Sequence, residues 1–242
     1  MKIIYIILIG IFILLAKLTI FTMDNLILSP ITYALWRTME IGLITTLIFY
    51  SNYKKSIEIK SSLVNLLKNY KVASLIVSYN EDPETVQNIL LSVKDATGKM
   101  GDVYLLDDST HKEKVEQNKK FCDENNIKYI HRENRRGYKA GALNYFLKIY
   151  GDNYDLIPVF DLDQRPIKPF FYDLLPFFND PKVAFVQVPQ AYTESNTKVV
   201  MGATFQQMPF NEIVISGRDI TGSAFLLGSG FIARVSALKD VN

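Results

Sequence analysis

The chain has 242 residues, of which 48% are hydrophobic, 21% are charged and one is cysteine, and its formal net charge is +2. This length suits one sizeable domain with or without a membrane anchor, and the apolar content excludes a disordered chain. A single cysteine excludes an internal disulfide and a cysteine-based zinc cage. The near-neutral charge gives no overall attraction to a polyanion, so we expect no nucleic-acid partner.

Two long apolar stretches begin the chain. Residues 3–23 carry one charge and are long enough to cross a bilayer core of roughly 30 Å as a helix. Residues 26–50 match that length and contain Arg37 and Glu40, which can pair on one helical face. We therefore expect two transmembrane helices, a helical hairpin, within residues 1–50. A cleaved signal peptide is the alternative for the first stretch, and a buried soluble helix is the alternative for the second.

The segment after these stretches is rich in lysine. Lysines recur between residues 54 and 71, whereas the short connection between the two stretches has none. By the positive-inside rule we expect a multi-pass protein of the cell membrane, with both ends of the hairpin and the remaining domain in the cytoplasm. Apolar residues at helical spacing also predict that residues 51–71 form a basic amphipathic segment at the membrane interface. A solvated helix packed on the soluble domain is the alternative.

From residue 72 onward, short apolar runs alternate with amphipathic segments. We expect strands at 72–79, 103–107, 128–131, 156–161 and 183–188, and helices after Asp82, over 113–124, from about 140 and over 169–178. Strands that are apolar throughout are typical of a parallel sheet covered on both faces, so residues 72–242 favour an open, Rossmann-like α/β sheet. No glycine-rich dinucleotide fingerprint follows the first strand, and the chain has no P-loop motif.

Polar residues follow the predicted strands, and ligands of such sheets collect at the carboxyl ends of strands. Asp161 and Asp163 are two residues apart and point to one side, where a divalent cation would relieve their repulsion. Mg²⁺ or Mn²⁺ binds one or two carboxylates together with substrate phosphates, so this DxD pattern predicts a metal–diphosphate site. Arg135, Arg136 and Lys139 could balance phosphate charge nearby. Solvated strand-end aspartates and a solvated helix entrance are the alternatives.

The motifs at the strand ends resemble those of family 2 glycosyltransferases, especially the membrane-embedded cellulose synthase-like group. They are SYNE at 78–81, LLDDS at 105–109, RGYKAGALN at 136–144, DLDQRP at 161–166, VAFVQVPQ at 183–190 and LLGSGFIARVSAL at 226–238. The resemblance covers about residues 72–238. It implies a GT-A type nucleotide-binding fold and inverting transfer of a sugar from a UDP-sugar, with Mg²⁺ or Mn²⁺, to a glycan, polysaccharide or lipid-linked acceptor.

The resemblance also implies roles for individual residues. Tyr79 and Glu81 would line the uridine pocket, and Asp108 would contact the base with Asp107 beside it. Lys139 would meet the donor phosphates, Asp161 would lie near the ribose and diphosphate, and Asp163 would be the principal metal ligand, with Asp161 also at the metal. Gln187 to Gln190 and Gly228 to Gly230 would line the sugar and acceptor side, although a strand end and a turn are equally ordinary explanations for them.

The sequence departs from the family pattern in its acceptor part. The family places its general base in a Thr/Ser-Glu-Asp motif after residues 226–238, and neither that motif nor a QxxRW motif occurs before Asn242. We therefore expect a donor-binding half, with a second subunit as a possible source of the base and acceptor motifs. One alternative is a non-catalytic nucleotide-sugar-binding or scaffold subunit of an envelope polysaccharide complex. Another is a lipid-linked sugar transferase with Asp219, Glu212 or Glu194 as its base.

Overall fold

The computed structural model describes residues 2–21, 29–40, 42, 69–167, 169–192, 197–220 and 222–241. The chain forms two compact units, one from residues 1–58 and 192–224 and the other from residues 59–191 and 225–242. All predicted strands and the seven substrate- and metal-site residues assigned by the resemblance belong to the second unit.

The first unit is mostly helical in its described part. It contains α1 (Lys2–Phe21), a helical stretch at residues 29–40, α7 (Lys198–Pro209), the π-helical segment η3 (Phe210–Ile215) and α8 (Ser216–Ile220). The rings of Phe12 and Trp36 lie 6.1 Å apart, so α1 contacts the helix at 29–40. Arg37 forms an ion pair with Glu40, as their spacing predicts.

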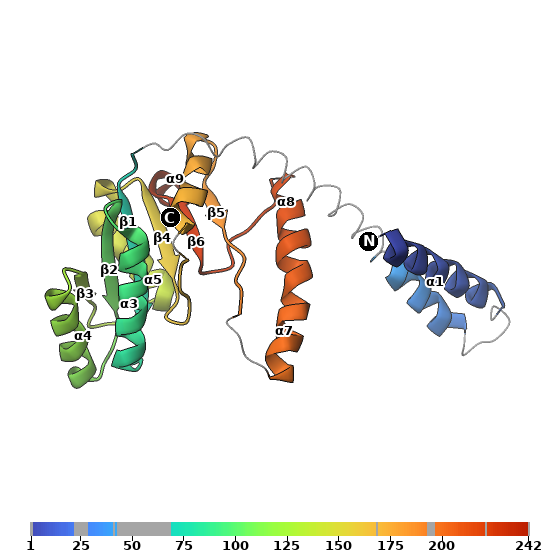
Figure 1. Ribbon diagram of the computed structural model, residues 1–242, viewed down its shortest axis with the longest axis horizontal. Helices are drawn as coiled ribbons and strands as arrows, with labels where there is room; N and C mark the ends of the chain where they lie inside the picture. Colours follow the sequence, from blue (N-terminus) through green and yellow to red (C-terminus); the bar gives the residue numbers. More distant parts are fainter. Residues whose placement is uncertain are drawn as a thin grey trace. The chain divides into compact units, whose positions relative to one another are not determined.

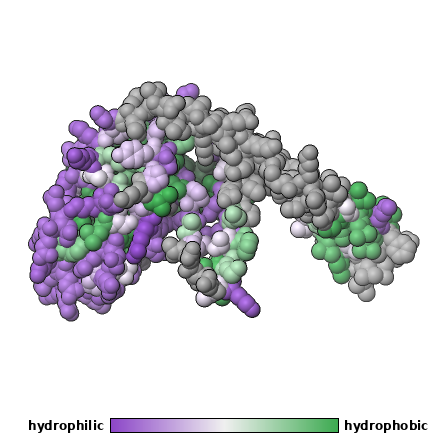
Figure 2. Space-filling model, in the orientation of Figure 1, coloured by the Kyte–Doolittle hydropathy of each residue, from purple (hydrophilic) through white to green (hydrophobic). Residues whose placement is uncertain are grey.

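Two helices of this unit, α1 and α7, expose large apolar side chains. Leu14 and Ile20 of α1 are 64% and 69% exposed, and Figure 2 shows hydrophobic residues along this helix. Val199 and Phe205 of α7 are 81% and 70% exposed. Within the described ranges, no helix has both the length and the apolar character that a membrane span requires. The end of the second predicted span and nearly all of the predicted interfacial segment fall on residues 41 and 43–68, outside the described residues.

The second unit is built on one six-stranded sheet. Its strands are β1 (Val72–Ser78), β2 (Gly101–Asp107), β3 (Lys128–His131), β4 (Leu156–Phe160), β5 (Phe185–Gln187) and β6 (Phe231–Arg234), in the spatial order β3-β2-β1-β4-β6-β5. The predicted open α/β sheet is confirmed, but it is mixed, because β6 runs antiparallel to both β4 and β5. The sequence did not predict β6, which enters the sheet between two strands that lie much earlier in the chain.

Helices cover both faces of this sheet (Figure 1). On one face, the core contains residues of α3 (Pro83–Thr97), α4 (Lys112–Glu124), α6 (Phe170–Leu174) and the 3-10 turn η2 (Leu175–Asn179). On the other face it contains residues of α5 (Tyr138–Tyr150), which continues into the 3-10 turn η1 (Gly151–Asn153), and of α9 (Val235–Asp240). The helix expected over 169–178 is divided between α6 and η2, where Pro176 supplies no backbone N–H to continue an α-helical ladder.

The register of the parallel strands brings three strand ends together. Ser78 at the end of β1 is paired with Asp107 at the end of β2, and Ile76 of β1 is paired with Phe160 at the end of β4. Residues that follow these strands therefore emerge at the same edge of the sheet. This edge carries the predicted site residues.

Candidate donor-binding site

The two aspartates at the end of β2 have different environments. Asp107 is completely buried, and its carboxylate accepts hydrogen bonds from the Ser109 N–H (2.9 Å), Asn118 Nδ2 (3.0 Å) and the Tyr129 hydroxyl (2.9 Å). Burial, followed by the Asp107 charge, raises the pKa of Tyr129, so its phenol keeps its proton and remains a donor. Asp107 therefore holds the end of β2 against α4 from inside the fold, and the predicted contact with the base is left to Asp108.

Asp108 is bound to an arginine that was absent from the predicted site. Arg132 Nε donates to Asp108 Oδ1 at 2.7 Å and Arg132 Nη2 donates to Asp108 Oδ2. The same guanidinium donates to the backbone oxygens of Arg136 (3.3 Å) and Tyr138 (3.1 Å). The hydrogen bond with Asp108 raises the pKa of Arg132. This pair ties the end of β2 to the loop before α5, and the only sequence signal for Arg132 was its place directly after the third strand.

Tyr79, which follows β1, has a second arginine on its ring. Arg135 Cζ lies 3.4 Å from the centroid of the Tyr79 ring and 5.0 Å from that of Tyr138. The turn after β1 is fixed by Asn80, which has a positive φ of 54° and whose Oδ1 accepts from the Thr110 N–H at 2.9 Å. Glu81 is exposed and makes no hydrogen bond or ion pair with any described residue. The structure therefore brings Tyr79, but not Glu81, into contact with the basic loop.

The loop after β4 carries the DxD pattern. Lys139, in the first turn of α5, forms an ion pair with Asp161, and the two side chains are 31% and 44% exposed. Asp163 is exposed and has neither an ion pair nor a hydrogen bond to the described part of the chain. Two of the predicted phosphate-site residues, one cation and one carboxylate, are thus in direct contact.

A glutamine connects the DxD turn to the predicted acceptor side. Gln164 Oε1 accepts from the Asp161 N–H at 3.2 Å, while its Nε2 donates to Ser229 Oγ at 2.8 Å. Gln190 Nε2 donates to the same oxygen at 3.3 Å, and Gln187 Nε2 donates to the Ser229 backbone oxygen at 2.9 Å. The segments predicted to line the acceptor side therefore lie together beside Asp161. Gln164 and Ser229 lie inside the quoted motifs, but their pattern gave no role to either residue alone.

The residues available for a metal are few. Among the described residues, no three His, Cys, Asp or Glu side chains are grouped as a metal site would require. Mg²⁺ or Mn²⁺ commonly takes one or two protein carboxylates and completes its shell with phosphate and water oxygens. The Asp161 and Asp163 carboxylates fit a cation of that kind, which binds together with a diphosphate. The sequence also offered three acidic residues as alternative bases: Asp219 is exposed in α8 of the first unit, and the side chains of Glu194 and Glu212 lie outside the described residues.

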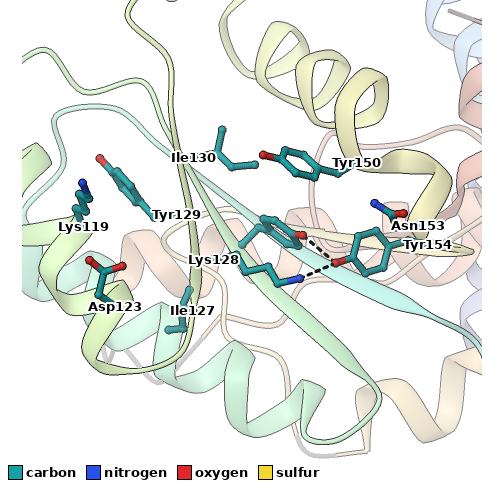
Figure 3. Close-up of a pocket in the computed structure, with 10 residues that line it drawn as sticks. Lys119, Asp123, Ile127, Lys128, Tyr129, Ile130, Tyr150, Asn153 and Tyr154 are labelled. Atoms are coloured by element: carbon teal, nitrogen blue, oxygen red, sulfur yellow. Dashed lines mark hydrogen bonds between the residues drawn. The ribbon is translucent and has the colours of Figure 1, made fainter.

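A hollow of about 640 Å³ lies elsewhere, along the edge strand β3 and the adjoining ends of α4 and α5 (Figure 3). Its polar groups are largely satisfied by one another. The hydroxyls of Tyr104 and Tyr154 are 2.8 Å apart, and Lys128 Nζ donates to Asp102 at 2.7 Å and to the Tyr154 hydroxyl at 3.2 Å. Burial raises the pKa of Tyr154, which keeps this hydroxyl protonated. None of the predicted site residues lines this hollow, and its network stabilises the sheet edge.

Comparison with known proteins agrees with the motifs. The family model described as "Glycosyl transferase family 2" matches residues 74–241. The chain is 31% identical over 149 residues to glucomannan 4-beta-mannosyltransferase 1 of Cyamopsis tetragonoloba, a match that covers 57% of this chain and 28% of that protein. It is 30% identical over 145 residues to the cellulose synthase catalytic subunit (UDP-forming) of Pseudomonas fluorescens (strain SBW25), covering 57% of this chain and 19% of the relative. The chain thus matches less than a third of the length of these curated relatives.

Among solved structures, a mannosyltransferase from Pyrobaculum calidifontis in complex with GDP-Man and Mn²⁺ is 16% identical, with a TM-score of 0.43, covering 62% of this chain and 47% of that one. The family model spans the mixed α/β sheet from within β1 to α9, including every strand-end motif described above. The chain therefore belongs to glycosyl transferase family 2, and it is similar to the cellulose synthase-like members of that family.

Proposed function

We propose that the chain is a membrane-anchored inverting glycosyltransferase, or the donor-binding half of one, that transfers a sugar from a UDP-sugar to a polysaccharide or another glycan acceptor. The observation that carries this proposal is the Lys139–Asp161 contact between the start of α5 and the end of β4, with Asp163 exposed two residues further on. A cation and two carboxylates at one edge of the sheet are the groups that a metal diphosphate needs.

The start of α5 favours an anion. The helix has no acidic residue in its first turn, its N-cap residue Gly137 offers no side-chain hydrogen bond, and Lys139 adds a positive charge there. The partial positive charge of a helix N-terminus and a nearby lysine together favour a phosphate group. In the structure the Asp161 carboxylate compensates the charge of Lys139. In the proposed complex the donor diphosphate balances part of the Lys139 charge.

Asp163 and Asp161 are the proposed ligands of a divalent cation, Mg²⁺ or Mn²⁺. When bound, such a cation stabilises the negative charge that develops on the departing diphosphate, so the leaving group needs no proton donor. Tyr79, Glu81 and Asp108 are proposed to bind the nucleoside. The cluster of Gln187, Gln190 and the turn at Gly228–Gly230 is proposed to face the sugar and the acceptor. The general base has no assigned residue, and a second subunit is the proposed source of the base and acceptor motifs.

Membrane attachment is proposed from the sequence of residues 3–23 and 26–50. The exposed apolar side chains on α1, among them Leu14 and Ile20, are consistent with a lipid environment, since large exposed apolar patches mark interaction surfaces. The lysines after residue 53 support a cytoplasmic location of the glycosyltransferase domain, where nucleotide-sugar donors would reach it.

The test is calorimetric titration of UDP into the full chain, purified in mild detergent, with Mn²⁺ and again with a chelator. We expect metal-dependent binding that falls at least tenfold in Asp163→Ala. The matched control is Glu116→Ala, which removes an exposed carboxylate from α4 and should bind as the unmodified chain does. GDP titrated in parallel tests the nucleotide preference. Equal binding by Asp163→Ala and Glu116→Ala would remove Asp163 from the site, and a folded chain that binds no UDP would overturn the donor function.

A further inference from the structure

A guanidinium covers one face of Tyr79. At 3.4 Å between Arg135 Cζ and the ring centroid, the two planar groups are in full contact, because non-bonded carbon atoms approach to about 3.5–4.0 Å at best. The Tyr138 ring lies near the same guanidinium, at 5.0 Å. Arg135 therefore fills the space beside Tyr79 that a third flat group would need in order to stack on that face.

The backbone of the loop that carries Arg135 is held by a different arginine, Arg132. Gly137 and Tyr138 have φ values of 78° and 51°, and a non-glycine residue in this region is uncommon. Arg132 stabilises the conformation by donating to the backbone oxygens of Arg136 and Tyr138, as described above. The loop is thus anchored through Asp108 and Arg132, and Arg135 takes no part in that anchor.

The backbone oxygen of Arg135 accepts from the Tyr138 N–H at 3.0 Å, whereas its guanidinium lies against the Tyr79 and Tyr138 rings. Its guanidinium makes no hydrogen bond and no ion pair with the described residues, and the residue is exposed. Moving it into solvent therefore breaks no directional contact. An exposed cation–π contact is weak, so another planar group of larger area could replace the guanidinium on the ring.

We propose that Arg135 is a displaceable plug on the nucleobase platform of Tyr79. The base of the nucleoside diphosphate, a flat aromatic heterocycle, stacks on the ring face that Arg135 leaves, so base and guanidinium compete for one surface. The inference rests on the proposed donor function and adds a step to it. The donor exchanges with the Arg135 side chain instead of binding to an uncovered ring face.

The test is titration of uridine, which carries no phosphate charge, and of UDP into the full chain in detergent. Arg135→Ala removes the plug and one positive charge, and Arg136→Ala removes the same charge from the neighbouring position. We expect Arg135→Ala to bind uridine about two- to fivefold more tightly than Arg136→Ala does, the factor expected from losing one weak competing cation–π contact. In a Tyr79→Leu background, the same Arg135→Ala substitution should give no gain, because the contested ring is absent. Thermal unfolding of each variant checks that the fold is retained.

Each result decides the proposal. Tighter uridine binding that requires Tyr79 supports the plug. Uridine binding by Arg135→Ala that is equal to or weaker than that of Arg136→Ala overturns it, because the guanidinium would then be neutral or a direct ligand contact. If UDP binds in that case, the donor function stands while the plug falls. If no folded variant binds UDP, the donor function fails and the plug fails with it.

Discussion

Removing one partner of the Asp108–Arg132 pair should be one of the most destabilising single changes in the second unit. The two side chains are 2% and 10% exposed, and Arg132 donates four hydrogen bonds, two to the carboxylate and two to the loop backbone. Removing one partner of a buried pair leaves the other charged and desolvated, at a cost of about 3–5 kcal/mol. Arg132→Met should therefore lower the free energy of unfolding by about that amount, a large part of the roughly 5–15 kcal/mol typical of a domain.

The assay is urea unfolding of the full chain in detergent, followed by far-UV circular dichroism. The matched control is Lys120→Met, which breaks an ion pair with Glu124 whose side chains are 78% and 60% exposed and 3.9 Å apart. That exposed pair should cost no more than about 0.5 kcal/mol. The double variant Arg132→Met/Asp108→Leu should recover much of the loss, since it leaves no unpaired charge. The reasoning would be refuted if Arg132→Met cost no more than the control. It would also be refuted if the costs of Arg132→Met and Asp108→Leu, measured singly, added up in the double variant.

Two further predictions concern the core and the turn before β6. Burial, assisted by the Asp123 and Asp107 charges, raises the pKa of Cys122 from 9.0 to about 12. Iodoacetamide should therefore label the folded chain slowly at pH 8 and the urea-unfolded chain quickly. Equal labelling rates of the folded and unfolded chains would contradict this burial. Because the pKa of the thiol is higher in the folded than in the unfolded chain, the thiol's contribution to stability should also decline as pH rises from 9 to 12. Gly230 has a φ of +63°, so Gly230→Ala should cost about 1–2 kcal/mol in urea unfolding, while Gly202→Ala on the open surface of α7 should cost nothing.

The local sequence pattern was sufficient to predict most strands and helices of the second unit. The strand at 72–78 is apolar except for two serines and the strand at 156–160 is apolar throughout. Helix α3 begins at Pro83 with an Asp82 side chain that accepts from the Thr85 N–H, as the capping signals predict. The strand at 231–234 was missed because it directly follows Gly228 and Gly230, and a pair of glycines is typical of a turn. Its antiparallel place between β4 and β5 depends on contacts across about 45–75 residues of sequence, which no local period reports.

The sequence predicted which residues form the candidate site, but only some of the contacts between them. Lys139 and Asp161 were expected at the phosphate site and do lie in contact. The bond between Asp108 and Arg132, however, joins residues 24 positions apart, and spacing alone gives no reason to select Arg132 from the basic stretch around it. This contact changes how an Asp108→Ala variant must be interpreted, because the substitution leaves the buried Arg132 without its carboxylate partner. A change in nucleotide preference in that variant would then report a displaced loop as well as a lost base contact.

The different roles of Asp107 and Asp108 follow from the geometry of a strand end. Successive side chains of an extended backbone point to opposite sides, so two adjacent aspartates cannot both face one ligand. The Asp107 carboxylate accepts hydrogen bonds from Asn118 and Tyr129, which leaves Asp108 as the carboxylate proposed to contact the nucleoside. Asp108 holds, through Arg132, the same loop that carries Arg135 and leads into Lys139. A change at the proposed base contact should therefore alter the proposed phosphate contact as well, because one loop connects the two.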